Sequence, residues 1–326
     1  MQSRLLVLVA LLLLPASAGA AAPSHGRILQ PDKLVILSST DVKGKTSPCG
    51  CHTPKGGLAR RAGVADSIRA EFGQVALVDA GGFFPDSSGR QGLVSFLMDA
   101  MSLLKTDAVG IAERDLRYGA SYLSAQAKRA GLPVVCANLI EKRSGKPLFD
   151  PYVIKQIGGV KVGFFGLIGE KADLGPSRDS LLAEEPAAVA RRTISELRKR
   201  GVDVVVLLGQ LGAVESENLV AAVDGVDALV VGAGTSVSAK GRLINKTVAS
   251  YGGEQGYYVC KTLLTLNSRQ QVITGEADAI LLGPDLPEQP AMRALVKGFE
   301  DGYNESLRKA EAQRAARVTG QDGGAR

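Results

Sequence analysis

The segment Ser47–His52 holds a dense group of reactive side chains, in the order Ser-Pro-Cys-Gly-Cys-His. Two cysteine thiolates and an imidazole, from Cys49, Cys51 and His52, are ligands that a soft or borderline ion such as zinc or copper prefers. The segment therefore predicts a site for one zinc or copper ion. The further ligand would have to come from one of three acidic residues: Asp41, Glu113 or Asp115.

The same cysteines have other interpretations. In an oxidising compartment, Cys49 or Cys51 would form a disulfide with each other, with a partner chain, or with a remaining cysteine, Cys136 or Cys260. Cys136 and Cys260 lie in apolar runs, where a cysteine is usually a small buried hydrophobe. The local pattern leaves metal binding, disulfide or redox use, and a structural use all open.

Polar side chains follow several apolar runs at the point where each run ends. In a layered α/β fold, the carboxyl ends of neighbouring strands gather at one edge of the sheet, and sites form in the loops there. We therefore expect a functional site built from segments that are far apart in the sequence. These segments are Thr40–Gly44, Asp79–Phe84, Ala112–Gly119, Leu208–Gly212 and Val231–Thr235.

The apolar runs themselves predict buried strands. They are short and nearly continuous in Val, Leu and Ile, as expected for strands covered on both faces. The predicted strands are Lys33–Thr40, Val75–Ala80, Ala108–Ile111, Pro133–Asn138, Val160–Ile168, Val202–Leu208 and Val226–Gly232.

Amphipathic stretches between the runs predict helices over Leu58–Phe72, Val94–Leu104 and Pro186–Arg200, the last ending just before Gly201. Arg60 and Arg61 lie off the apolar stripe of the first helix. They are expected either on a solvent-exposed helix face or at the edge of the site, where they would attract an anion. The alternation of strands and helices indicates a layered α/β fold.

The segment Asn245–Leu282 looks entirely strand-forming, including the long run Gly256–Leu266. A second sheet packed on the first would account for it. The predicted fold is therefore an α/β fold with a layered β-sandwich flanked by helices.

The first 22 residues have the layout of a secretory signal peptide. Arg4 precedes the apolar run Leu5–Leu14, which is too short to span a bilayer, and small residues follow it. No later segment is apolar over a membrane-spanning length, so we expect no membrane span after signal removal. The expected location is periplasmic or secreted.

The formal net charge of +6 is spread along the chain, and the sequence has no Trp. A basic stripe interleaved with aromatic residues is not visible, so we expect no nucleic-acid partner. A partner, if there is one, is expected to be another exported protein. We expect one domain over residues 23–285, then a C-terminal helix and disordered tail over 286–326, with Ala291–Arg317 as the helical part.

The strand-end segments resemble, in order, the motifs of the 5′-nucleotidase and UDP-sugar hydrolase branch of the calcineurin-like metallophosphoesterases. That branch has D-x-H, G-D, G-N-H-E, S-H-L-G and G-H-S-H at these positions. The connecting segments Gly56–Arg60 and Lys161–Leu167 are also typical of it. The resemblance covers about Lys33 to Leu266, without the C-terminal substrate-binding domain of the longer enzymes. It implies a metallophosphoesterase-type β-sandwich and phosphoester hydrolysis by two divalent ions that activate a bridging water.

Most metal-binding positions of that family have other residues in this sequence, although Asp41 retains the first ligand. Glycine and alanine cannot bind a metal ion, and a lysine or arginine beside Asp41 would repel one. The sequence has only two histidines, His25 and His52, so the family's dinuclear site cannot be assembled. The replacements are Lys43 for the D-x-H histidine, Gly82 for the G-D aspartate, Glu113 and Arg114 for the asparagine and histidine of G-N-H-E, Gln210 for the S-H-L-G histidine, and Ala233 and Thr235 for the histidines of G-H-S-H.

These substitutions change the charge around Asp41. A carboxylate that metal ions balance in the family would be balanced here by Lys43 or Arg114, as an ion pair. The leading hypothesis is an exported, non-catalytic relative, a pseudoenzyme that serves in binding or assembly. The alternative is an active phosphoesterase that recruits Asp41, the Cys49–His52 loop and Asp115. A third hypothesis is a redox protein that uses the Cys49/Cys51 pair.

Overall fold

The structure is a computed structural model that describes residues 30–87 and 89–321. The predicted signal peptide, residues 1–22, and His25 lie outside the described residues, as do residues 322–326 of the predicted tail. Signal peptide, tail and domain boundaries therefore stay predictions. Within the described residues, no helix combines the length and apolar character needed to cross a membrane.

The first of two large sheets has five strands in the order β13-β12-β1-β2-β3. Strand β1 pairs parallel with β2 and antiparallel with β12, and β2 pairs parallel with β3. The carboxyl ends of β1, β2 and β3 therefore share one edge. The strands are β1 Lys33–Ser39, β2 Val75–Asp79, β3 Ala108–Val109, β12 Tyr258–Leu266 and β13 Val272–Leu281.

The second large sheet has six strands in the order β10-β11-β9-β8-β6-β5, and a two-stranded sheet pairs β4 with β7. Strands β6, β8, β9 and β11 run parallel to one another, so their carboxyl ends also share an edge. The strands are β4 Leu139–Glu141, β5 Tyr152–Ile157, β6 Val160–Ile168, β7 Leu181–Ala183, β8 Val204–Gln210, β9 Ala228–Val231, β10 Arg242–Ile244 and β11 Thr247–Tyr251.

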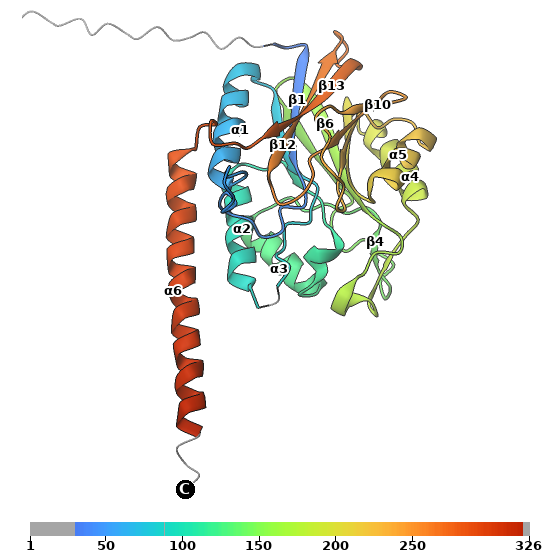
Figure 1. The fold of residues 1–326 in the computed structure, drawn as a ribbon. Coiled ribbons are helices and arrows are strands. Elements are labelled where there is room, and N and C mark those ends of the chain that lie inside the picture. Colours follow the sequence, from blue (N-terminus) through green and yellow to red (C-terminus); the bar gives the residue numbers. More distant parts are fainter. Residues whose placement is uncertain (1–29, 88, 322–326) are drawn as a thin grey trace, which may run out of the picture.

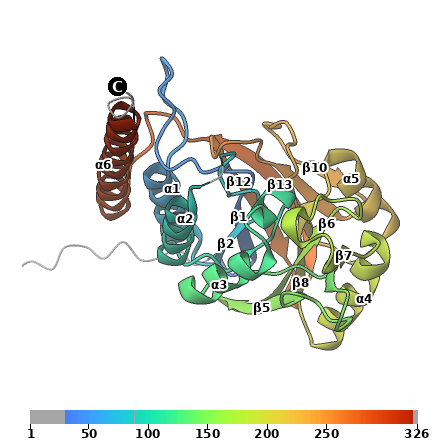
Figure 2. The ribbon, with the colours of Figure 1, turned by 90° about the horizontal axis from the view of Figure 1, so that it is seen from below.

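The two sheets pack face to face between two layers of helices (Figures 1 and 2). Leu34, Ile36 and Val78 from the first sheet meet Phe164 and Val206 from the second in a core that excludes water. Helices α1 and α2 cover the first sheet, with the first turns of α6 packed outside them, and α4 and α5 cover the second. The helices are α1 Leu58–Phe72, α2 Gln91–Leu103, α3 Ala120–Ala130, α4 Pro186–Lys199, α5 Ala213–Ala222 and α6 Pro290–Gln321, with short 3-10 turns η1 Glu113–Leu116 and η2 Gly175–Ser177.

This architecture confirms the predicted α/β sandwich, with two local differences. Pro133–Asn138 is not a strand: only Val134 and Val135 form isolated bridges, and Pro133 has no N–H to contribute to a ladder. The strands within Asn245–Leu282 do not form a sheet of their own. Instead β11 joins the second sheet while β12 and β13 extend the first.

Helix α6 packs against the domain through its first turns. Met292 and Val296 are buried against α1 and α2, and the Phe299 ring stacks on Phe96 with 4.1 Å between ring centroids. The remainder of the helix extends away from the body of the domain (Figure 1). The predicted helix Ala291–Arg317 lies within α6.

Candidate functional site

A cavity of about 1060 Å³ opens at the carboxyl edge of both sheets. Its lining comes from the loops after β1, β3, β6, β8, β9 and β11, as expected for a site at the strand ends. Six of the predicted site residues border it directly: Asp41, Lys43, Glu113, Arg114, Gln210 and Ala233.

Asp41 lies at the centre of this edge, directly after β1. Its backbone has a left-handed φ of 50°, and its N–H donates to the Gly81 carbonyl at 2.8 Å. Its carboxylate accepts the Thr40 hydroxyl at 2.8 Å. Burial raises the pKa of Asp41, although the Thr40 hydroxyl, the Gly234 amide, and the charges of Lys43 and Arg114 act in the opposite direction.

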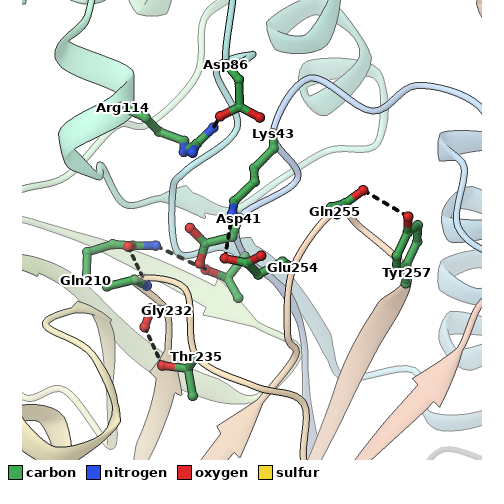
Figure 3. A network of polar contacts seen from close by, with 12 residues as sticks. Asp41, Lys43, Asp86, Arg114, Gln210, Gly232, Thr235, Glu254, Gln255 and Tyr257 are labelled. Carbon is green, nitrogen blue, oxygen red and sulfur yellow. Dashed lines mark hydrogen bonds and ion pairs between the residues drawn. The ribbon is translucent and has the colours of Figure 1, made fainter.

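Gln210 fills the position of a family histidine at the end of β8. Its Nε2 donates to the Thr40 hydroxyl at 3.0 Å, and its Oε1 accepts the Ala233 N–H at 2.7 Å (Figure 3). A Cβ at Gly232 would approach Gln210 Nε2 to 2.3 Å, so glycine is needed for this close contact. Both ends of the amide are therefore bonded within the protein.

Lys43 pairs with Glu254, a residue of the loop between β11 and β12. Lys43 Nζ lies 2.5 Å from Glu254 Oε1, and the two side chains are 18% and 36% exposed (Figure 3). The cation thus stands where the D-x-H histidine would bind metal, and its charge is already balanced by Glu254.

Arg114 also has a partner other than Asp41. Its Nη1 lies 2.9 Å from Asp86 Oδ1 and donates to the Phe84 carbonyl at 3.1 Å. The hydrogen bond from Arg114 lowers the pKa of Asp86. The prediction that Lys43 or Arg114 forms an ion pair with Asp41 was therefore wrong, because nearer carboxylates on other loops take both cations.

The remaining predicted site residues make hydrogen bonds to the protein backbone. Glu113 points toward the loop after β6, where its carboxylate accepts the Asp173 N–H at 3.0 Å. Thr235 donates its hydroxyl to the Gly232 carbonyl at 2.7 Å. Ala233 has a left-handed φ of 60° and contributes only its backbone N–H.

Gly82 lies directly against Asp41. It has φ of 78°, and a Cβ placed on it would approach Asp41 Oδ1 to 2.4 Å. The Asp41 carboxylate therefore occupies the space next to the position from which the family's bridging aspartate would project.

Asp115 binds the backbone of Gly82. It is fully buried, and its carboxylate accepts the backbone N–H groups of Gly82 at 2.7 Å, Phe84 at 3.0 Å and Ala112 at 2.9 Å. Burial raises the pKa of Asp115 to about 7, although these three amides lower it. Asp115 thus holds the β2 and β3 loops together and does not line the cavity.

The substitution Gly82→Asp is expected to lower the free energy of unfolding by roughly 1–3 kcal/mol. A side chain at this left-handed position would clash with Asp41 and add a second carboxylate beside it. Gly89→Asp is a matched control, because Gly89 has φ of 76° and a Cβ there meets nothing within 4 Å. Urea unfolding should give a larger loss at position 82, and equal losses would contradict this account.

The residues present do not fit the family's dinuclear metal site. Lysine, arginine, glycine, alanine and threonine stand at ligand positions, and the Gln210 amide is already engaged. Among the described residues, no group of three or more His, Cys, Asp or Glu side chains is placed to hold a metal ion. We therefore derive no chemistry that runs through metal ions at this edge.

The structure also separates the predicted zinc or copper ligands. Cys49 and Cys51 form a disulfide with each other, so neither sulfur is available as a thiolate in this state. Asp41 is buried at the strand edge, whereas Cys51 and His52 are exposed on a loop that does not border the cavity. The loop lies away from the cavity because its ends are tied to α1 and to the segment before α6.

Sequence reasoning missed several residues of the site. Glu254 and Asp86, the partners of the two cations, lie in loops that were not flagged. The segment Gly252-Gly253-Glu254-Gln255-Gly256 follows a strand, and this glycine-rich pattern is the signal that could have found Glu254.

Arg60 and Arg61 were placed wrongly, since both are buried. Arg61 Nη1 lies 3.3 Å from Asp79 Oδ2. Arg60 donates to the Pro54 and Leu282 carbonyls at 2.7 and 3.2 Å.

Comparison with known proteins shows which proteins this chain resembles. No family model matches the chain. It is 28% identical over 236 residues to a 2′,3′-cyclic-nucleotide 2′-phosphodiesterase/3′-nucleotidase of Salmonella typhimurium, covering 61% of this chain and 36% of that enzyme. It is 28% identical over 232 residues to a 5′-nucleotidase of Vibrio parahaemolyticus, covering 67% and 41%.

A solved structure of a 5′-nucleotidase precursor from Thermus thermophilus superposes with a TM-score of 0.74 at 22% identity, over 84% of this chain and 59% of that one. This chain is therefore similar in sequence to enzymes of the 5′-nucleotidase group, and its fold is that of the calcineurin-like phosphoesterases. It spans well under half the length of the two curated relatives, at 36% and 41%. This chain therefore shares the framework of these relatives, while hydrogen bonds and ion pairs engage Lys43, Arg114 and Gln210 at the strand-end edge.

Proposed function

We propose that this 5′-nucleotidase relative has lost two-metal phosphoester hydrolysis and serves as a binding domain. The main support is the Lys43–Glu254 ion pair. It places a lysine, already neutralised by a carboxylate, at the position where the related enzymes have a metal-binding histidine. Two-metal hydrolysis needs several carboxylates and neutral imidazoles converging on the ions, and Asp41 is the one such ligand retained.

The cavity supports a role in binding small polar molecules. A volume of about 1060 Å³ is ample for a drug-sized ligand. Glu170, Lys171 and Glu215 line it, and in the part of the chain that the structure describes they form no ion pairs. Acidic residues outnumber basic ones in the lining, which disfavours a phosphate monoester and favours a neutral or cationic ligand. Because the relatives are named for nucleotides, nucleosides are the first candidates.

Location and partners belong to the same proposal. The layout of residues 1–22 and the word precursor in the name of the Thermus thermophilus protein support export. We propose a periplasmic or secreted protein, with another exported protein as the partner of any assembly it joins.

The proposal predicts negligible hydrolysis of nucleotides and p-nitrophenyl phosphate by the purified protein, with or without Mn²⁺ or Zn²⁺. Elemental analysis of the purified protein should find no stoichiometric bound metal. A catalytic 5′-nucleotidase assayed under the same conditions is the positive control. Metal-dependent turnover that Asp41→Ala abolishes would contradict the proposal and favour the alternative, an active hydrolase with a remodelled site.

Binding is tested in parallel by thermal unfolding with adenosine and adenosine 5′-monophosphate. A ligand that binds only the folded state raises the unfolding temperature, and the nucleoside is expected to raise it more than the nucleotide. Glu215→Gln should reduce the shift, whereas Glu71→Gln, an exposed residue outside the cavity, should not.

A further inference from the structure

The loop between β1 and α1 contains the Cys49–Cys51 disulfide, and hydrogen bonds hold both ends of this loop. The Cys49 N–H donates to the Lys55 carbonyl at 2.9 Å, and the Leu58 N–H donates to the Thr46 carbonyl at 2.9 Å. Arg60 holds the Pro54 carbonyl at 2.7 Å. Figure 2 shows the loop, in blue, standing out from the body of the domain on the side of α1 and α6.

The tip of this loop is open to an approaching molecule. Gly50, Cys51, His52 and Thr53 are exposed, whereas Cys49 is half-buried. A Cβ at Gly50 would meet nothing within 4 Å. An attacking thiolate can therefore reach the Cys51 sulfur, and exposed disulfides are the ones that take part in exchange.

The second sulfur, Cys49 Sγ, is suited to be the leaving group when the disulfide is attacked. The Lys55 N–H donates to Cys49 Sγ at 3.3 Å, and this amide would stabilise the negative charge on a departing Cys49 thiolate. A leaving thiolate that is stabilised in this way departs faster. The two sulfurs thus have different environments, one accessible to attack and one supplied with a hydrogen-bond donor.

We propose that the Cys49–Cys51 pair is a thiol–disulfide exchange centre that oxidises a dithiol on a partner protein. A partner thiolate attacks Cys51 Sγ, the Cys49–Cys51 bond breaks with its electron pair on Cys49, and a mixed disulfide forms at Cys51. The partner's second thiolate then attacks its own sulfur in that bond and releases the Cys51 thiolate. The partner dithiol becomes a disulfide, and its two protons end on Cys49 and Cys51.

The other cysteines do not take part. Cys136 and Cys260 are buried and unpaired, and burial raises the pKa of each to about 12. They remain protonated thiols in the folded protein and serve as internal controls for any labelling experiment. The proposal does not depend on the fate of the strand-edge cavity, since the loop does not border it.

The test uses the oxidised full chain with dithiothreitol as the probe dithiol and counts native-state thiols as they appear. We expect reduction to expose the Cys49 and Cys51 thiols while Cys136 and Cys260 stay unlabelled. Lys55→Pro, which lacks the N–H donor, should reduce about tenfold more slowly than Lys55→Ala, which keeps it. With glutathione disulfide, Cys49→Ser should form the mixed disulfide at Cys51 at least about tenfold faster than Cys51→Ser forms one at Cys49.

Three outcomes would overturn the proposal. The first is a protein that keeps both thiols free under oxidising conditions. The second is equal reduction rates for the two Lys55 variants, provided that circular dichroism shows both to be folded. The third is stoichiometric protection of the reduced pair from alkylation by added Zn²⁺, which would assign the loop to a metal site with His52.

Discussion

Replacing Asp79 with asparagine is expected to lower the free energy of unfolding by about 3 kcal/mol or more. Asp79 ends β2 with no exposed surface, and Arg61 reaches it from α1 with a side chain that is only 4% exposed. Only Arg61 Nη1 bonds Asp79, and within the described residues Arg61 Nε and Nη2 have no hydrogen-bond partner. Removing the carboxylate charge therefore leaves a buried guanidinium without compensation.

The electrostatics of the pair support this size of effect. Burial raises the pKa of Asp79 and lowers that of Arg61, while the attraction between them opposes both shifts. Arginine nevertheless stays charged, since its pKa begins above about 12. The asparagine keeps an oxygen that can accept the Gly81 N–H, but its amide nitrogen replaces the oxygen that accepts from Ser39 and Arg61.

Urea unfolding followed by circular dichroism measures this loss. The matched control is the double variant Asp79→Asn with Arg61→Met, in which the orphaned charge is also removed. The double variant should recover much of the loss, because replacing a buried ion pair by an apolar group is often close to neutral. A loss below about 1 kcal/mol in the single variant, or additive losses in the double variant, would contradict the account.

The contribution of Asp115 to stability is expected to decrease as the pH rises from about 4 to about 7. In the folded protein the pKa of Asp115 is about 7, against an ordinary value of 3.8. The folded state therefore binds this proton more tightly than the unfolded state, and stability falls with pH across that window. The difference between a pKa of 3.8 and one of about 7 corresponds to at most about 4 kcal/mol.

The measurement compares unfolding free energies of the parent and Asp115→Asn across this pH window. The difference between them should change because only the parent ionises at this position. Asp86→Asn is a control that should show no change across this window, since Arg114 lowers the pKa of the exposed Asp86 below its ordinary value of 3.8 and its contribution is lost only at lower pH. If the parent and Asp115→Asn keep a constant difference, the three amides hold Asp115 ionised throughout and the prediction fails.

The sequence alone determined the elements and the edge where the site forms. The apolar runs that became β1, β2, β6 and β8 are local patterns, and burial on both faces requires such runs wherever they occur. The order of the motifs at the strand ends indicated the resemblance to the 5′-nucleotidase branch, and the residue types at Lys43, Gly82 and Ala233 showed where the chain departs from its metal-ligand pattern.

Only the tertiary structure decided which groups meet at that edge. Lys43 pairs with Glu254 and Gln210 bonds Thr40, partners that lie 211 and 170 residues apart in sequence. Their contacts depend on how the two sheets pack and on which loops then come together, and no local period carries that information.

The loop containing Cys49 and Cys51 shows the same division. Its composition marked it as reactive, but its direction, away from Asp41 and toward α6, follows from where Arg60 and Leu282 hold its ends. The buried Arg60 side chain donates to the Pro54 and Leu282 carbonyls and pairs with Glu288, and packing brings these groups together only in the folded chain.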